Sequence, residues 1–294
     1  MNKTLTYNIG GIGIQVNFLC PFLFPDNKAG SHFFQDSFHS WILNICSTND
    51  INIKDYRLTF AGSEEFDIEI PYKWSLYSSS IKKAIVFEFE QDDYFSKGIA
   101  EINIETKTIE LSLVHHQQSE KKIDPFFHPF GILLLQYLVH LNSGVIIHAS
   151  AVEYKNKGYL FSAISGTGKS TMANLWKSCG AKIINDDRII ISPQKSEYYL
   201  HNTPMPHYQD QNKKAPLYKA FLLKQAKENY IEPLSPIKST MGLLSNCIQY
   251  QYDEGQVKQR LNTLENIAQN YGVFELGFKP DTSIVSFIEN YFET

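Results

Sequence analysis

The residues best suited to chemistry are a glycine-rich loop and, a short distance along the chain, two acids. The loop reads SGTGKS over Ser165–Ser170, and the acids are Asp186-Asp187. Glycines allow backbone N–H groups to turn toward an anion, and the N-terminus of a following helix adds partial positive charge. In such a loop Lys169 would reach the terminal phosphates of a nucleotide, and the Ser170 hydroxyl would ligate Mg²⁺. The chemistry indicated is nucleotide phosphate binding.

The residues around the loop predict a strand before it and a helix after it. Tyr159–Phe161 is a short apolar run typical of a buried strand, and Thr171–Ser178 has a helical pattern that Gly180 is placed to end. Ala163 stands where the G-x-x-x-x-G-K-[ST] pattern has its first glycine, so the match is one residue short, although its context supports it. A serine/glycine turn before a helix is the alternative. The predicted nucleotide-binding residues are Ser165, Gly166, Thr167, Gly168, Lys169, Ser170 and Thr171.

The two acids follow a second predicted strand, Lys182–Ile184. This places them at the carboxyl end of a strand neighbouring the loop, which is the usual ligand edge of an α/β sheet. One carboxylate can hold Mg²⁺, and the other can accept the proton of an attacking hydroxyl. We assign metal binding to Asp187 together with Ser170, and the role of base to Asp186, with the reverse division left open. The alternative is a solvated turn, because Asn-Asp-Asp is good turn chemistry.

His148 is the third candidate, in the apolar run VIIHASAV, which predicts a strand before the loop. A single histidine in an apolar strand is more often a hydrogen-bonded core residue than a catalyst. It also titrates near neutral pH and could orient an acceptor or a phosphate. We therefore count His148 with Asp186 and Lys169 as a candidate catalytic residue.

These residues resemble the catalytic domain of the bacterial HPr kinase/phosphorylase family, and more distantly the nucleotide site of ATP-dependent phosphoenolpyruvate carboxykinase. A histidine strand, a loop ending G-K-S, a helix with a terminal glycine and Asp-Asp-Arg follow one another in that family. The matching residues here are His148, Gly166, Gly168, Lys169, Ser170, Gly180, Asp186, Asp187 and Arg188. The sequence of this segment is also similar to that of stand-alone HPr-kinase-like proteins of peptide-modification gene clusters, some of which phosphorylate a peptide serine.

The resemblance is strong over roughly 144–192 and weak elsewhere, and it implies an ATP- and Mg²⁺-dependent kinase of the P-loop type. Thr171 stands where HPr kinases usually carry glutamate, and their later glutamate–arginine–glycine segment has no clear counterpart. The HPr substrate and the dephosphorylation reaction are therefore left open. The resemblance favours a serine of a peptide or protein as the acceptor.

Composition excludes several other classes of protein. The chain has 294 residues, of which 43% are hydrophobic, and a formal net charge of -4, so it shows no electrostatic footprint for nucleic acid and no basic run for a membrane surface. The longest apolar stretch, Phe130–Leu141, is too short to span a bilayer. The N-terminus has no apolar signal core, and the four cysteines form no C-x-x-C pair. We expect a cytoplasmic protein with reduced thiols.

The order of patterns predicts an α/β protein with a β-rich N-terminal half. Leu5–Phe18 predicts a hairpin or a bulged strand, and alternating runs such as Ala84–Glu90 and Thr108–Leu113 follow. Polar Gln117–Asp124 is interpreted as a linker, so we predict a β-rich domain over 1–124, which could recognise the substrate. The predicted kinase-like domain covers 125–294, a mixed α/β domain of the HPr-kinase/carboxykinase type.

Later features of the chain have two interpretations each. Asn202–Pro216 predicts a long loop, either a substrate lid with Lys213 and Lys214 facing an acidic group or a solvated segment. Arg260 could bind phosphate, with a solvated helix face the favoured interpretation.

The predicted function is ATP-dependent phosphorylation of a hydroxyl. Two alternatives remain open, a kinase for free serine or a similar small molecule and a nucleotide-binding regulatory module without transfer. The partners expected are therefore ATP and a peptide, protein or small hydroxyl acceptor. The sequence leaves the oligomeric state open, a homo-oligomer included.

Overall fold

The computed structural model describes residues 3–19, 40–64, 72–79, 82–116, 124–204, 213–248 and 254–293. The fold class is α/β with a β-rich N-terminal half, which confirms the prediction. Two compact units are present, Met1–Leu135 with Pro204–Gln209 (unit 1) and Gln136–Thr203 with Asp210–Thr294 (unit 2). Within the described ranges, no helix has the length and apolar character needed to cross a membrane.

Unit 1 contains an eight-stranded sheet in the order β1-β2-β3-β8-β7-β6-β5-β4. β1 and β2 form the predicted hairpin, joined by Gly10 and Gly11 at φ 61° and 79°, a conformation that glycine adopts without steric cost. The parallel pairs are β2 with β3 and β3 with β8, and the remaining neighbours are antiparallel. The strands are β1 Lys3–Ile9, β2 Ile12–Phe18, β3 Trp41–Ser47, β4 Arg57–Glu64, β5 Tyr72–Ser78, β6 Lys83–Phe89, β7 Phe95–Asn103 and β8 Thr108–His115.

Unit 2 is built on a sheet whose strand pairings close a circuit. The order is β10-β9-β12-β13-β14-β16-β15, and β10 also pairs with β14. β9 connects the two parts of this circuit, because its first half pairs with β12 and its second half pairs with β10 and β11. The strands are β9 Val145–Tyr154, β10 Lys157–Ser162, β11 Lys182–Asn185, β12 Arg188–Gln194, β13 Glu197–Asn202, β14 Lys214–Gln225, β15 Tyr230–Pro233 and β16 Val273–Phe278.

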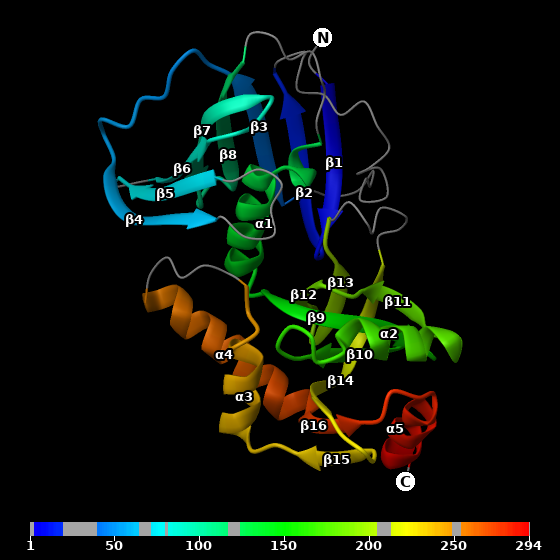
Figure 1. The fold of residues 1–294 in the computed structure, drawn as a ribbon. Coiled ribbons are helices and arrows are strands. Elements are labelled where there is room, and N and C mark those ends of the chain that lie inside the picture. Colours follow the sequence, from blue (N-terminus) through cyan, green and yellow to red (C-terminus); the bar gives the residue numbers. More distant parts are fainter. Residues whose placement is uncertain are drawn as a thin grey trace. The chain divides into compact units, whose positions relative to one another are not determined.

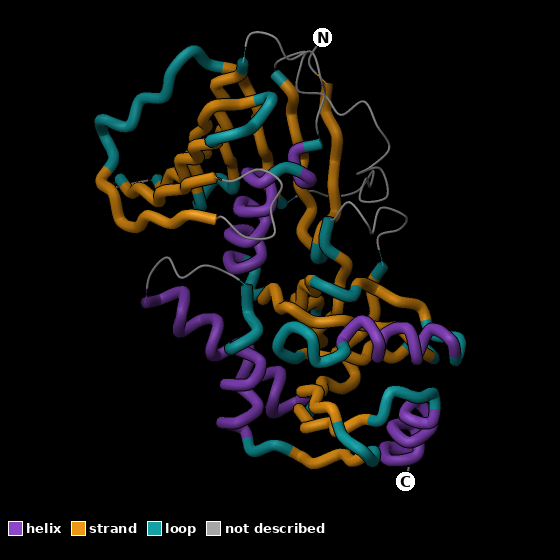
Figure 2. The backbone as a smooth tube through the Cα atoms, in the orientation of Figure 1, coloured by secondary structure: helices purple, strands orange, loops and turns teal. Residues whose placement is uncertain are grey.

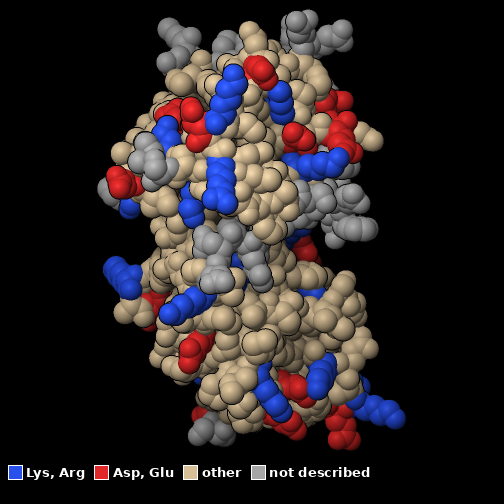
Figure 3. Space-filling model, turned by 90° about the vertical axis from the view of Figure 1, so that its left-hand side faces the viewer, with Lys and Arg blue, Asp and Glu red and all other residues tan. Residues whose placement is uncertain are grey.

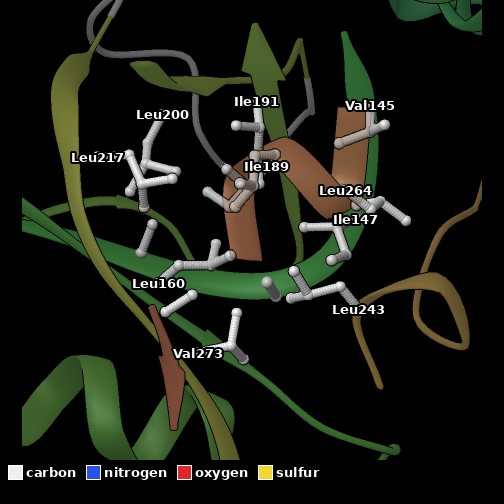
Figure 4. Close-up of a cluster of buried hydrophobic side chains, with 14 of the residues drawn as sticks. Val145, Ile147, Leu160, Ile189, Ile191, Leu200, Leu217, Leu243, Leu264 and Val273 are labelled. Atoms are coloured by element: carbon white, nitrogen blue, oxygen red, sulfur yellow. The ribbon is translucent and has the colours of Figure 1, made fainter. Parts of the chain in front are cut away.

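Helices cover both faces of the central strands of unit 2 (Figures 1 and 2). One buried cluster joins Ile147 and Leu160 of the sheet to Leu243 and Leu264 of α3 and α4 (Figure 4). A second cluster joins Phe161 and other sheet residues to α2 and α5. The helices are α1 Pro129–Leu141, in which the boundary between the units falls, α2 Lys169–Ser178, α3 Pro236–Leu244, α4 Glu254–Tyr271 and α5 Ser283–Glu293.

The strand pattern differs from the prediction where tertiary pairing decides the structure. β3, β5 and β15 were not predicted; in β3, Ile42 and Cys46 are apolar on the face opposite the core, so polar and apolar residues do not alternate. The predicted loop over 202–216 is shorter than expected, because β14 begins at Lys214, which pairs with β13. Residues 117–123 of the predicted linker and 205–212 lie outside the described residues.

Two predictions for single charged residues can be compared with their surroundings. Arg260 is only 4% exposed, so the interpretation as a solvated helix face is wrong. It lies close enough to Cys247 for its charge to oppose the effect of burial, which raises the pKa of that thiol to about 12. The Lys214 ammonium lies 5.7 Å from the centre of the Tyr199 ring.

Lysine, arginine and acidic side chains are interspersed on the face drawn in Figure 3.

Candidate functional site

The glycine-rich loop and the acids lie at one edge of the unit 2 sheet because of their strand directions. β10, which precedes the loop, and β11, which precedes the acids, both pair antiparallel with β9. They are therefore parallel to each other, with β9 between them, and their carboxyl ends point the same way. The sequence predicted this shared edge, but not the strand between the two elements. That strand contributes His148 to the same edge.

Two glycines of the loop have a left-handed backbone conformation. Gly166 and Gly168 have φ of 80° and 111°, a region that L side chains rarely adopt. At Gly168 an added Cβ would also lie 2.9 Å from the Phe278 ring, whereas nothing lies within 4 Å of one at Gly166. Ala163, where the motif has its first glycine, is not among the described residues with positive φ, so alanine fits there without strain.

The helix after the loop begins without a side-chain cap. Gly168 is the N-cap residue of α2 and makes no side-chain hydrogen bond to the first turn. Uncapped N–H groups at a helix N-terminus form a ready site for an anion. Ser165, Gly166, Ser170 and Thr171 are exposed there, and Thr167 is half-buried.

Lys169 is buried, and its ammonium group is directed at the loop. Its Nζ donates to the carbonyl oxygens of Ala163 at 2.9 Å and Ile164 at 3.3 Å. Burial lowers the pKa of Lys169, and the charge of Asp187 opposes that shift. Neutral carbonyls replace the hydration of a cation only in part, so an incoming phosphate would be a stronger partner than those carbonyls.

Asp187 lies among three basic side chains. Its Oδ1 is 3.4 Å from His148 Nε2, and its Oδ2 is 3.2 Å from Arg188 Nε. The hydrogen bond with His148, followed by the charges of Arg188, His148 and Lys169, lowers the pKa of Asp187, although burial opposes the shift. The carboxylate therefore stays ionised at neutral pH. An ionised carboxylate of low basicity suits a metal ligand better than a proton acceptor.

The structure thus brings Lys169, Asp187 and His148 together, and half-buried Asp186 directly precedes Asp187 in the same turn. Among the described residues, no group of three or more histidine, cysteine or acidic side chains could by itself hold a metal ion. One or two carboxylates are nevertheless enough for Mg²⁺ that arrives with a nucleotide, because the phosphates and water supply its remaining ligands. The donor set therefore fits Mg²⁺-nucleotide rather than a metal that is held by protein alone.

Three buried polar residues support these side chains, and the sequence analysis did not assign them a role. Ser150 Oγ donates to the Lys169 carbonyl at 2.9 Å, which fixes the start of α2 against β9. Ser162 Oγ donates to the His148 carbonyl at 3.2 Å. Asn185, fully buried, bonds to the backbone of the acidic turn. The signal that could have found them is polarity inside apolar strands, since buried polar groups need hydrogen-bond partners.

Comparisons with known proteins give two likenesses. The family model described as "SynChlorMet cassette protein ScmC" matches residues 130–275, just under half of the chain. The chain is similar to a solved structure, the Hpr(Ser) kinase/phosphatase from Coxiella burnetii, at 12% sequence identity and a TM-score of 0.29. The alignment covers 51% of this chain and 99% of that chain. The search of curated proteins finds no match.

Proposed function

We propose that this protein transfers the terminal phosphoryl group of Mg²⁺-ATP to a hydroxyl group, with a serine of a peptide or protein as the favoured acceptor. The observation that carries the proposal is the meeting of a buried phosphate-loop lysine, Lys169, with the ionised carboxylate of Asp187 at one sheet edge. A cation for the phosphates and an anion for the metal are the two charges that such a site must supply. The choice of a serine acceptor comes from the family resemblance.

Residues 165–171 would hold the nucleotide. Backbone N–H groups of the loop and of the first turn of α2 would bind phosphate oxygens. The Lys169 ammonium would leave the carbonyls of Ala163 and Ile164 and pair with the terminal phosphates. Ser170 and Asp187 would hold Mg²⁺, which neutralises charge on the transferred group when it is bound.

Asp186 is the proposed base. In the transfer step the acceptor oxygen forms a bond to the terminal phosphorus, the bond from that phosphorus to the bridging oxygen breaks, and ADP leaves with the bond electrons. The hydroxyl proton passes to the Asp186 carboxylate. His148, already 3.4 Å from Asp187, would orient the acceptor or the phosphate. Asp187 is less suited to be the base, because its pKa is lowered by its neighbours.

The test is phosphoryl transfer from Mg²⁺-ATP, read by mass spectrometry, to a panel of free serine, serine-containing peptides and HPr-like protein. Wild-type protein and Asp186→Asn would be compared, with Glu197→Gln, an exposed carboxylate on β13, as the matched control. We expect Asp186→Asn to bind ATP and to lose at least 100-fold in transfer rate, within the usual range for a general base. Full transfer by Asp186→Asn would move the role of base to another group, and ATP binding without transfer to any acceptor would favour a regulatory nucleotide-binding module.

A further inference from the structure

Asn185 lies directly before the two acids and is fully buried at the end of β11. Its side-chain oxygen accepts two backbone hydrogen bonds, from Asp187 N at 2.9 Å and from Arg188 N at 3.2 Å. An asparagine that accepts backbone N–H groups two and three residues ahead fixes a turn locally. The backbone of the acidic turn is therefore held by one amide oxygen.

The other end of the same amide joins this turn to β13. Asn185 Nδ2 donates to Asn202 Oδ1 at 2.8 Å and to Thr203 Oγ1 at 3.3 Å. Thr203 Oγ1 in turn donates to the Arg188 carbonyl at 2.9 Å. The hydrogen bonds form a closed ring through Asn185, Thr203 and Arg188. Asn202 and Thr203 are buried, so water does not compete freely for these bonds.

This ring holds the backbone next to the Asp187 carboxylate. The backbone on both sides of Asp187 is fixed, since its N–H bonds to Asn185 and its carbonyl accepts from Ala149 N at 3.0 Å. With both peptide groups held, the side chain lies where its Oδ1 is 3.4 Å from His148 Nε2 and its Oδ2 is 3.2 Å from Arg188 Nε. Metal ligands need this kind of outer support, because a small rotation of a carboxylate moves its oxygens out of the coordination sphere.

We infer that Asn185, supported by Thr203, is a positioning residue that holds Asp187 for Mg²⁺-nucleotide binding. The inference rests on the proposed function. A solvated turn of the Asn-Asp-Asp type would not need a buried asparagine whose oxygen and nitrogen are both fully used. The amide is instead built into the protein beneath the acids, where it can act on the metal ligand without contacting the nucleotide.

The experiment uses four variants of the full chain. Asn185→Ala removes both ends of the amide, and Asn185→Ser leaves a shorter hydroxyl that can accept from the turn more weakly. Thr203→Val interrupts the ring while leaving Asn185 in place, so it serves if Asn185→Ala folds poorly. Ile191→Val is the matched control, because it removes one methyl group from the buried face of neighbouring β12 and leaves every bond of the ring intact.

Two readouts separate positioning from folding. The first is hydrogen exchange at the amides of Asp187 and Arg188 without ligand, expected to be at least tenfold faster in Asn185→Ala and unchanged in Ile191→Val. The second is the thermal shift produced by ATP with EDTA and by ATP with Mg²⁺. We expect Asn185→Ala to keep the metal-free shift and to lose at least half of the extra shift from Mg²⁺. Asn185→Ser should be intermediate, and Thr203→Val should lose less than Asn185→Ala.

Each further outcome has a definite meaning. An undiminished Mg²⁺-dependent shift in Asn185→Ala, together with faster amide exchange, would overturn the inference and leave Asn185 a purely structural residue. Loss of the metal-free shift in both Asn185→Ala and Thr203→Val would also overturn it, because the ring would then support the whole unit. No shift with ATP in the wild-type protein would contradict the proposed function itself, a result that these patterns cannot be confused with.

Discussion

Both units bury polar side chains, but they use them differently. In unit 1, His128 Nε2 lies 2.9 Å from Asp92 Oδ2, and Tyr7 donates to Asp124 at 3.1 Å. These pairs join distant parts of the unit, and aromatic rings surround His128. In unit 2, Asn185, Ser150 and Ser162 bond to the backbone next to Asp187, Lys169 and His148. The two pairs of unit 1 connect distant parts of the fold, whereas the three residues of unit 2 lie around one sheet edge.

The difference shows how a site can be recognised without a bound ligand. Two buried polar groups that are hydrogen-bonded to each other contribute to stability and are not available to bind or react with a ligand. Buried groups that bond to the backbone of Lys169, Asp187 and His148 use their hydrogen bonds to hold those residues in place. If this distinction is correct, substitutions in unit 1 should reduce stability, and substitutions in unit 2 should reduce binding or catalysis first.

The largest effect is expected at Lys169. Lys169→Met should abolish the thermal stabilisation by Mg²⁺-ATP, because the phosphates lose their buried cation; ATP at 100 times its Kd would otherwise add about 2.7 kcal/mol. Without nucleotide we expect a stability within about 1 kcal/mol of wild type, since a desolvated charge has been removed. Differential scanning fluorimetry with and without Mg²⁺-ATP measures both quantities.

The control for that measurement is Lys177→Met, on the exposed face of the same helix, which should keep the full shift. A full ATP shift in Lys169→Met would remove the phosphate-loop assignment. A large loss of stability without nucleotide would instead show that Lys169 belongs with the structural pairs of unit 1.

His128→Phe should have the next largest effect, and it should appear in stability alone. The aromatic volume among Phe89, Phe95 and Phe130 is kept, but buried Asp92 loses one hydrogen-bond partner, which costs about 1–3 kcal/mol. Denaturant unfolding measures this loss, and ATP binding should remain. Exposed His116→Phe is the control, expected to change stability by less than about 0.5 kcal/mol. If the stability of His128→Phe equals that of wild type, the hydrogen bond between His128 and Asp92 does not stabilise unit 1.

Two glycines of unit 2 allow strain to be separated from site geometry. Gly168→Ala and Gly180→Ala both place a Cβ at positive φ, 111° and 95°, which costs about 1–2 kcal/mol each. Gly168→Ala should cost more, because its Cβ would also meet the Phe278 ring, and it alone should weaken ATP binding. Thermal unfolding and ATP titration of the two variants test this. Equal ATP affinity in both would indicate that the conformation at Gly168 does not shape the phosphate site.

The last comparison concerns pH, and the effects of pH on stability should have opposite signs in the two units. Burial raises the pKa of Asp124 in unit 1 to about 6, so the stability this group contributes is present below its ordinary pKa near 3.8 and is lost as pH rises through 6. Burial lowers the pKa of His201 in unit 2 to about 3. The contribution of His201 to stability is present above pH 6.5 and decreases as the pH falls toward 3. Either slope is at most about 1.4 kcal/mol per pH unit.

Hydrogen exchange of strand amides between pH 4 and pH 7 can follow the two units separately. Asp124→Asn should flatten the dependence in unit 1, and His201→Gln should flatten it in unit 2. The slope of unit 2 should be unaffected by Asp124→Asn. Slopes of the same sign in both units would contradict the opposite shifts of these two buried groups.

The sequence predicted the site elements better than it predicted the sheets. The Ser165–Ser170 loop, the helix that follows it and strand Val273–Phe278 were predicted from local signals such as glycine placement and apolar periodicity. Strand β3 was missed because its two faces are both largely apolar. Arg260 was interpreted as a solvated residue because its helix pattern cannot reveal what packs against it, and it is buried.

By itself, the sequence determined which residues are candidates for binding a nucleotide, since the order of loop, helix, strand and acids is a local pattern and the glycines permit the positive φ that the loop adopts. Tertiary structure alone decided how these residues meet. β9 lies between the loop strand and the acid strand and carries His148 to Asp187, and the ring of bonds through Asn185 joins segments 17 and 18 residues apart. Such contacts depend on strand pairing and on the burial of each amide, and no local pattern encodes either of these.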